Sequence, residues 1–501
     1  MSKKRVGLNV GRAVRRIRTD AWDDIWPDAL QQTSLPSSRT ELNACRRRIG
    51  AFRRGSSKIP RAREGLIPKP NGLMRPAHQL TTDARVYYQS LVDSFMYDID
   101  KRLVGKNHVF GYRPLSPRGT KAPFGFGLRQ WKRFREQVRR EVDSGAYEAL
   151  VRTDLAAFFE RVPHGALEER LTSLGVRDDL AKELRAFLRT TMGRAHGLPQ
   201  GPDPSGLLAS VYLHPLDQAI IGAGYGYVRY VDDIVVLAKT PTDAKKALRL
   251  LEAEARRLDL IVQSAKTELV VGRSAIVAAV ADDDEIAGVD YAIRFRGRVA
   301  GIEAVRKAWR TASRTRPVPR RTVKYLLGRL TDNRDPAAVK WCLARLGELD
   351  YLAPTISRYL AVFATRKSVQ DAVATHLTSV DNISEWEEMN LIRAMLSASH
   401  VGRPLLARAR LVAADRNAGR EVRQYAFVLL GRHGDPADHD FIARESLDEE
   451  SLAQAALLAL QNADPKTRGR HSADTSTLYP ESRALAVKLR SRRVSIWPDF
   501  R

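Results

Sequence analysis

Three aspartates stand at the ends of short apolar segments and could do metal-dependent chemistry. Asp154 follows the segment 148–153, and Asp232 and Asp233 lie inside the β-branched run 227–237. Such segments predict strands, and the second one predicts a hairpin with its turn at Asp232-Asp233. Carboxylates at the end of buried strands carry a large desolvation cost unless a cation neutralises them. The acids therefore indicate Mg²⁺, and two such ions can clamp the attacking and leaving oxygens of a phosphoryl displacement.

A solvated surface turn is the alternative interpretation of Asp232-Asp233, because aspartates are common in turns between strands. The isolated Asp154 at the end of another apolar segment favours the metal site. Two strand ends can meet at one edge of a sheet, so the two acidic sites can share their ions.

Four motifs, taken together and in this order, resemble those of the reverse transcriptases. They are Asp154 to Phe159, Leu198-Pro199-Gln200-Gly201-Pro202-Asp203-Pro204-Ser205, Tyr230-Val231-Asp232-Asp233, and the segment 260–267 that contains Lys266. They resemble the family's first catalytic motif, its LPQGxxxS motif, its YxDD box and the lysine-bearing motif that follows. The resemblance covers roughly residues 60–300. It implies an α+β polymerase right hand, with fingers and a ferredoxin-like palm.

The resemblance also implies a role for each matching residue. Asp154, Asp232 and Asp233 would be catalytic and would hold two Mg²⁺ ions, with the Leu155 carbonyl as a further ligand. Phe159 matches the steric gate, whose ring leaves no room for a 2′-hydroxyl, so dNTPs are expected over rNTPs. The other implied contacts are those of Gln200, Gly201 and Lys266 with the nucleotide, and of Tyr230 with nucleic acid.

An edge hairpin is predicted before these motifs, because an Asn71-Gly72 turn joins two short extended pieces flanked by prolines. It carries Lys69 and Arg75. The resemblance implies that both side chains contact the triphosphate of the incoming nucleotide. The alternative is that both side chains are simply solvated.

The sequence Phe110-Gly111-Tyr112-Arg113-Pro114 resembles the GYRP or GFRP sequence of group II intron and related bacterial reverse transcriptases. Two roles for Arg113 are weighed equally. In one role the side chain contacts template or triphosphate, and in the other it orders a loop.

The chain is strongly basic, with a formal net charge of +26 over 501 residues. A polyanion attracted by counterion release is the simplest partner, and an inert basic surface or an acidic membrane are the alternatives. We expect no membrane role, since the sequence shows neither a long apolar run nor a signal-peptide core. The two cysteines, Cys45 and Cys342, form no disulfide framework and fit the reducing cytoplasm.

Composition and spacing divide the chain into four expected regions. They are a basic helical extension (1–58), fingers and palm (59–300), a helical thumb-like region (301–350) and an α-helical repeat-like domain (351–501). Within the palm, helices are expected at about 205–220 and 243–258. In the last domain, recurring Asp-Pro breaks at 335, 435 and 464 favour HEAT-like repeats, through which the chain could form a homo-oligomer.

The leading functional interpretation is an RNA-directed DNA polymerase that uses an RNA template and dNTPs to make DNA. The sequence lacks a Cys- and His-rich maturase region and the motifs of retron enzymes. A palm followed by a long helical region resembles the bacterial abortive-infection and defence-associated reverse transcriptases. That resemblance implies anti-phage defence with a partner noncoding RNA. Alternatives are untemplated or protein-primed synthesis, a group II intron or retron-type enzyme, an RNA-dependent RNA polymerase, and a non-catalytic RNA-binding scaffold.

Overall fold

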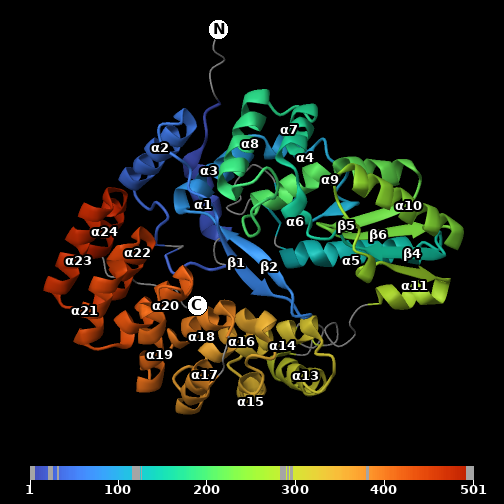
Figure 1. Cartoon of the computed structure of the whole chain (residues 1–501). Coiled ribbons are helices and arrows are strands. Elements are labelled where there is room, and N and C mark those ends of the chain that lie inside the picture. Colours follow the sequence, from blue (N-terminus) through green and yellow to red (C-terminus); the bar gives the residue numbers. More distant parts are fainter. Residues whose placement is uncertain are drawn as a thin grey trace, which may run out of the picture. The chain divides into compact units, whose positions relative to one another are not determined.

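The computed structural model describes residues 6–20, 26–30, 33–115, 124–125, 127–281, 289, 293, 297–379 and 383–491. Contacts divide the chain into two compact units (Figure 1). The first comprises Met1–Trp26, Leu35–Gly65 and Ala77–Ala281, and the second comprises Pro27–Ser34, Leu66–Pro76 and Asp282–Arg501.

A five-stranded sheet forms the centre of the first unit, with strand order β3-β5-β6-β4-β7 (Figure 1). The strands are β3 (Val109–Phe110), β4 (Ala149–Thr153), β5 (Gly226–Tyr230), β6 (Asp233–Ala238) and β7 (Glu268–Val271). β3 runs parallel to β5, and the other neighbours are antiparallel. From β4 to β7 the chain follows the β-α-β-β-α-β order of a ferredoxin-like fold, so the predicted palm core is confirmed.

Two helices cover each face of this sheet. α9 (Pro204–Gly222) and α10 (Pro241–Arg257) pack on one face, and α5 (Gly127–Asp143) and α11 (Arg273–Val280) pack on the other. Successive strand residues point to opposite faces. Val151 and Val236 accordingly join the core that contains α9 and α10, whereas Leu150 and Leu237 join the core that contains α5 and α11. The sheet is buried on both faces, which explains why its strands are almost continuously apolar.

The remaining helices of the first unit lie before β4 or between β4 and α9. They are α1 (Val10–Asp20), α2 (Arg39–Arg54), α3 (Thr82–Asp93), α4 (Met96–Asp100), α6 (Phe158–Arg161), α7 (His164–Ser173) and α8 (Asp178–Met192).

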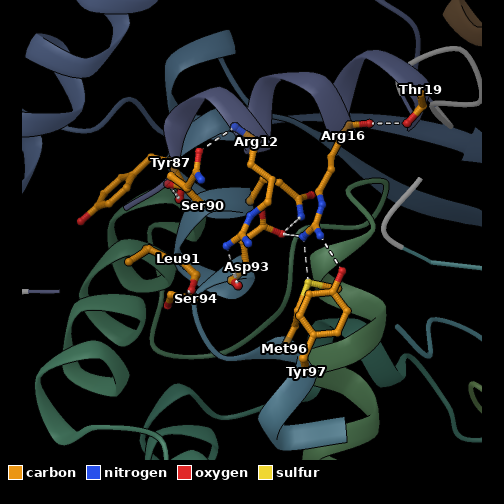
Figure 2. A network of polar contacts seen from close by, with 12 residues as sticks. Arg12, Arg16, Thr19, Tyr87, Ser90, Leu91, Asp93, Ser94, Met96 and Tyr97 are labelled. Atoms are coloured by element: carbon orange, nitrogen blue, oxygen red, sulfur yellow. Dashed lines mark hydrogen bonds and ion pairs between the residues drawn. The ribbon is translucent and has the colours of Figure 1, made fainter. Parts of the chain in front are cut away.

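A buried polar network fastens α1 to the end of α3 (Figure 2). Arg16 forms an ion pair with Asp93 and donates to the Tyr97 hydroxyl at 2.5 Å. Gln89 Nε2 donates to Asp93 Oδ1 at 2.8 Å. Ile17, on the same helix, is 1% exposed in the core. α1 is therefore an integral part of the first unit.

The predicted edge hairpin is present as β1 (Arg63–Pro68) and β2 (Met74–Gln79). Its turn is closed by the Lys69 amide, which donates to the Leu73 carbonyl at 2.7 Å. Gly72 has a φ of 78°, the left-handed conformation that an Asn-Gly turn needs.

The second unit is helical after residue 297, which confirms the expected helical C-terminal region. Its helices are α13 (Gly297–Ala312), α14 (Arg320–Asp332), α15 (Val339–Leu343), α16 (Ala353–Ala361), α17 (Lys367–Ser379), α18 (Glu385–Met395), α19 (Arg403–Ala414), α20 (Arg420–His433), α21 (Pro436–Glu445), α22 (Glu450–Ala459), α23 (Pro465–Leu478) and α24 (Arg483–Ser491). Even-numbered helices from α14 to α24 contact one another in series, as do odd-numbered helices from α15 to α23. Two such rows are the stacking pattern of a helical repeat array.

The Asp-Pro pairs lie at helix boundaries, as expected, and each pair begins the helix that follows it. Asp335 accepts a hydrogen bond from the Ala337 amide at 3.1 Å, and Asp435 accepts one from the Asp438 amide at 3.0 Å. Asp464 caps α23 in the same way, and a proline follows each aspartate at the first position of its helix.

Throughout the described ranges, no helix combines the length and the apolar character needed to cross a membrane.

Candidate active site

The register of β4 and β6 brings the three predicted acids to one end of two neighbouring strands. Thr153 lies opposite Ile234 in this antiparallel pair. One further step along the ladder sets Asp154 beside Asp233, and Asp232 precedes Asp233 in the hairpin turn. Asp154 is 9% exposed, Asp232 is half-buried and Asp233 is exposed. The acids thus span the range from the protein interior to solvent.

The hairpin turn consists of Val231 and Asp232, so the prediction of a turn at Asp232-Asp233 is wrong by one residue. Tyr230 pairs with Asp233, which already belongs to β6. Val231 has a φ of 55° and is 8% exposed. A positive φ suits the first position of a two-residue hairpin, but it is unfavourable for a β-branched residue. Such strain costs about 1–3 kcal/mol and persists only where the surroundings hold it.

Arg229 is one of the residues that keep Val231 in this strained conformation. Its Nη1 donates to the Val231 carbonyl at 2.8 Å, and its Nε and Nη2 donate to the two carboxylate oxygens of Asp217 at 2.8 and 2.7 Å. The Tyr227 hydroxyl also donates to Asp217, at 2.6 Å. Burial lowers the pKa of Arg229, but the ion pair with Asp217 outweighs burial and the net pKa is raised. Arg229 stays charged and ties the turn that carries Asp232 to α9.

The sequence interpretation did not identify this ion pair, although both of its members carry a signal. Arg229 is a charged residue inside an apolar strand, and Asp217 is one inside the apolar helix α9. Both are at most 1% exposed, and buried charges are rarely found unpaired.

Asp154 forms an ion pair through Oδ2 with Lys266 Nζ. Its Oδ1 is buried and has no hydrogen-bond partner among the described residues. A carboxylate oxygen in this state is suited to a hard cation such as Mg²⁺. Within the part of the chain that the structure describes, no three His, Cys, Asp or Glu residues are grouped closely enough to hold a metal ion. In this conformation the Lys266 ammonium sits against Asp154 where a cation would bind.

Phe159 links the first motif to the LPQG motif, because its carbonyl accepts from the Leu198 amide at 2.7 Å. Its half-buried ring packs edge-on against Phe158, with the ring centroids 5.4 Å apart. Phe158 is 2% exposed and belongs to the core, as does Leu155 at 3%. Of the two aromatic side chains, Phe159 is therefore the one that can reach a ligand.

The LPQG turn is fixed to β2 through its backbone. The His78 amide donates to the Gln200 carbonyl at 2.9 Å, and the Gln200 amide donates to His78 Nδ1 at 3.2 Å. Burial, together with the nearby Arg194 charge, lowers the pKa of His78 to about 4, so the imidazole is a neutral acceptor near pH 7. Gly201 has a φ of 131°, which favours glycine.

Tyr230 is mostly packed within the protein. Its ring lies edge-on to Trp131 at 5.1 Å, and its hydroxyl donates to the Gly127 carbonyl at 3.4 Å. Burial raises the pKa of Tyr230, and the charges of Asp233 and Asp203 raise it further. Asp203 is thus a further acid close to the hairpin, which the sequence interpretation did not single out.

Arg113 is 4% exposed, and all of its contacts are internal. Its guanidinium donates to Asp100 Oδ1 at 2.5 Å and to the Val104 carbonyl at 2.7 Å. Of the two roles weighed for Arg113, these contacts favour the ordering of a loop.

Lys69 and Arg75 belong to the second unit, whereas the other predicted site residues belong to the first. Within the second unit, Arg75 lies near two cations of α14. Burial lowers the pKa of Lys324, and the charges of Arg320 and Arg75 lower it further. The contact of Lys69 and Arg75 with a triphosphate remains a prediction.

Comparison with known proteins gives one family match. The family model described as "Reverse transcriptase (RNA-dependent DNA polymerase)" matches residues 67–326. None of the curated proteins that were compared matches the sequence.

Among solved structures, the chain is similar to telomerase from Candida albicans in complex with a TWJ fragment of telomeric RNA, with a TM-score of 0.35 and 11% identity. That alignment covers 67% of this chain and 64% of the telomerase, so the chain spans somewhat less than two thirds of that protein. Apo telomerase from Candida tropicalis gives a TM-score of 0.35 and 11% identity, with 84% and 75% covered. Similarity at this level assigns neither an activity nor a partner.

Proposed function

The chain belongs to the reverse transcriptase (RNA-dependent DNA polymerase) family, whose model matches more than half of its residues, and we propose that it is an RNA-directed DNA polymerase. It would extend a 3′-hydroxyl with dNTPs on an RNA template by two-metal nucleotidyl transfer. The observation that carries this proposal is the position of Asp154, Asp232 and Asp233 at one end of β4 and β6.

Each site residue has a task in this reaction. Asp154 and Asp232 would hold two Mg²⁺ ions with the Leu155 carbonyl, and Asp233 would support them from the solvent side. When bound, the metal supplies positive charge to the attacking and leaving oxygens of the displacement. Lys266, once it leaves Asp154, can neutralise or protonate the departing pyrophosphate, since its side chain is 66% exposed.

The nucleotide pocket would be formed by the two backbone-linked motifs. Phe159 would lie beneath the sugar and exclude a 2′-hydroxyl. Gln200 and Gly201 would contact the base pair, because their turn is held in place by His78. Lys69 and Arg75 would close on the triphosphate from the hairpin, which carries them on a short arm.

The biological role that we propose is bacterial anti-phage defence with a partner noncoding RNA. Two features support it. The palm is followed by two rows of stacked helices, which we interpret as HEAT-like repeats after a thumb-like start at α13 and α14. The net charge of +26 suits a long RNA partner.

The test is to purify the protein from cells, sequence the RNA that co-purifies, and sequence the product made with Mg²⁺ and labelled dNTPs. The wild-type protein should make DNA complementary to an RNA template. The variant Asp232→Ala/Asp233→Ala should keep the bound RNA and make no DNA. DNA synthesis that survives this double substitution would overturn the proposed mechanism, and synthesis from rNTPs alone would identify an RNA polymerase.

A further inference from the structure

A cavity of about 1050 Å³ lies in the first unit and includes none of the predicted site residues. Its walls come from four segments, namely the end of α2 with the linker to residue 61, Tyr87 of α3, the helix α8, and the turn 193–195. Phe52, Ile59 and Phe187 give it an apolar floor. We call it the α2–α8 cleft.

The cleft carries an excess of positive charge. Lys58, Arg61, Arg189 and Arg194 line it, and their side chains have no hydrogen-bond or ion-pair partner among the described residues. Its two acids are already engaged. Glu183 accepts from Arg53 Nε and Nη2 at 2.7 and 2.9 Å and from the Tyr87 hydroxyl at 2.7 Å, and Asp179 pairs with Arg177 at 2.8 Å. The four cations therefore have no neutralising group of their own in the cleft.

Arg194 has the clearest unsatisfied hydrogen-bond donors in the cleft. Its Nε and Nη2 are buried and find no acceptor among the described residues. A buried charged donor without an acceptor is costly. Its neighbour His78 is neutral near pH 7, since burial and Arg194 lower the pKa of His78 to about 4. A ligand that brings an anionic oxygen would satisfy these donors.

We propose that the α2–α8 cleft binds the sugar-phosphate backbone of a single-stranded RNA segment. Pockets for a single small ligand measure about 300–1,000 Å³, so a cleft of about 1050 Å³ has room for more than one nucleotide. Unpaired cations on three separate chain segments suit successive phosphates, and the half-buried Phe52 offers a ring for a base to stack on.

One wall of the cleft lies near the residue that holds the LPQG turn. Arg194 lies near His78, whose backbone and ring are hydrogen-bonded to Gln200. RNA held in the cleft would therefore lie close to the LPQG turn. This inference rests on the proposed function, because it assigns the cleft to the RNA of that reaction.

The test compares two triple variants that remove equal charge from the first unit. Arg61→Gln/Arg189→Gln/Arg194→Gln alters the cleft, and Arg249→Gln/Arg256→Gln/Arg257→Gln alters α10. Both are made in an Asp154→Asn background without dNTPs, so that binding is measured apart from synthesis. Anisotropy of a labelled single-stranded RNA should show at least ~10-fold weaker binding for the cleft variant. The slope of log K against log salt should fall by about 2, given ~0.7 per lost phosphate contact. The α10 variant should stay within about twofold of its parent.

A crosslinking experiment locates the RNA. Photo-crosslinks from 4-thiouridine RNA should map to peptides that contain Phe52 to Arg61 or Arg189 to Ala195. Equal losses in the two triple variants, or crosslinks confined to other peptides, would overturn the inference. Competition by free dATP as effective as that by RNA would also overturn it, because the cleft would then be a mononucleotide site. RNA bound in the cleft by the protein with Asp154 intact, if that protein makes no DNA from dNTPs and Mg²⁺, would contradict the proposed function and leave this inference standing.

Discussion

Lys266 Nζ is paired with Oδ2 of Asp154, whose carboxylate would hold a metal ion in the proposed reaction. The two residues are separated by 112 positions in the chain. They meet because the chain returns from α10 to run alongside the end of β4, where the Gln263 amide donates to the Asp154 carbonyl at 2.9 Å. The lysine thus neutralises the acid, and we expect it to compete with a cation for this carboxylate.

The variant Lys266→Met tests this competition. We expect it to bind Mn²⁺ about 2–5-fold more tightly, because the ion pair that the metal displaces is exposed on the lysine side and worth at most about 1 kcal/mol. Turnover should fall, since the leaving pyrophosphate loses its cation. Metal binding is measured by electron paramagnetic resonance without nucleotide. Lys246→Met on α10 is the control, and equal metal affinity in both variants would argue against the competition.

We expect the ion pair between Arg229 and Asp217 to affect the Mg²⁺ concentration that synthesis requires, and we expect no such effect from the buried ion pair between Arg16 and Asp93. Arg229→Lys cannot make all three hydrogen bonds to Asp217 and the Val231 carbonyl, so the strained turn should relax and Asp232 should move. We expect at least a ~10-fold higher Mg²⁺ concentration for half-maximal synthesis. Arg16→Lys is the matched control, because Arg16 is also buried against an aspartate, Asp93 of α3, and its other side-chain partners are Met96 and Tyr97 of α4.

Both substitutions should lower the free energy of unfolding, by up to about 3–5 kcal/mol if the buried pair is broken outright. Activity at saturating Mg²⁺ and the Mg²⁺ requirement are therefore measured below the unfolding temperature of each variant. A shift in Mg²⁺ requirement of the same size in Arg16→Lys would mean that Arg229 acts only on stability.

Phe159 and Phe158 make a second matched pair. Phe159→Ala should lower the preference for dNTPs over rNTPs by about 10–200-fold, the range over which a change of pocket size alters discrimination. Phe158→Leu should reduce stability without changing the preference, since Phe158 is a core residue at 2% exposure. The measurement is kcat/KM for dATP and ATP on one template. If the preference for dNTPs changed equally in both variants, Phe159 would not be the steric gate.

The palm could be predicted from the sequence because its signals are local. Apolar, β-branched runs and apolar helices each occupy short stretches, and the acids stand at the ends of strands that the ladder then brings together. The position of the hairpin turn could not be predicted, because Val231 adopts a positive φ that its own side chain disfavours. Tertiary contacts override that preference, among them the hydrogen bond from Arg229 to the Val231 carbonyl.

Side-chain pairings over long sequence separations were equally out of reach. Arg16 belongs to the expected basic helical extension, yet it is 3% exposed and paired with Asp93, 77 residues away. The Asp-Pro pairs of the second unit illustrate a different limit. The residues were correctly identified as boundaries, but the boundary is a helix start, because the aspartate accepts from backbone amides and proline fits the first helical turn.

The lowered pKa of His78 predicts how the free energy of unfolding depends on pH. Its pKa is lowered from 6.5 to about 4 by burial first and by the Arg194 charge second, and Glu64 Oε2 lies 3.6 Å from Nε2. The neutral imidazole is the folded form, so its contribution is complete above pH 6.5. As pH falls from 6.5 towards 4, the unfolded chain takes up a proton that the folded chain does not bind, and up to about 3 kcal/mol of stability is lost.

His78→Gln keeps an acceptor for the Gln200 amide and should reduce this loss of stability in denaturant titrations between pH 7 and 4. His196→Gln, at an exposed side chain, should lose stability with falling pH to the same extent as the wild-type protein. A slope that is identical in all three proteins would show that the LPQG turn does not depend on a neutral His78.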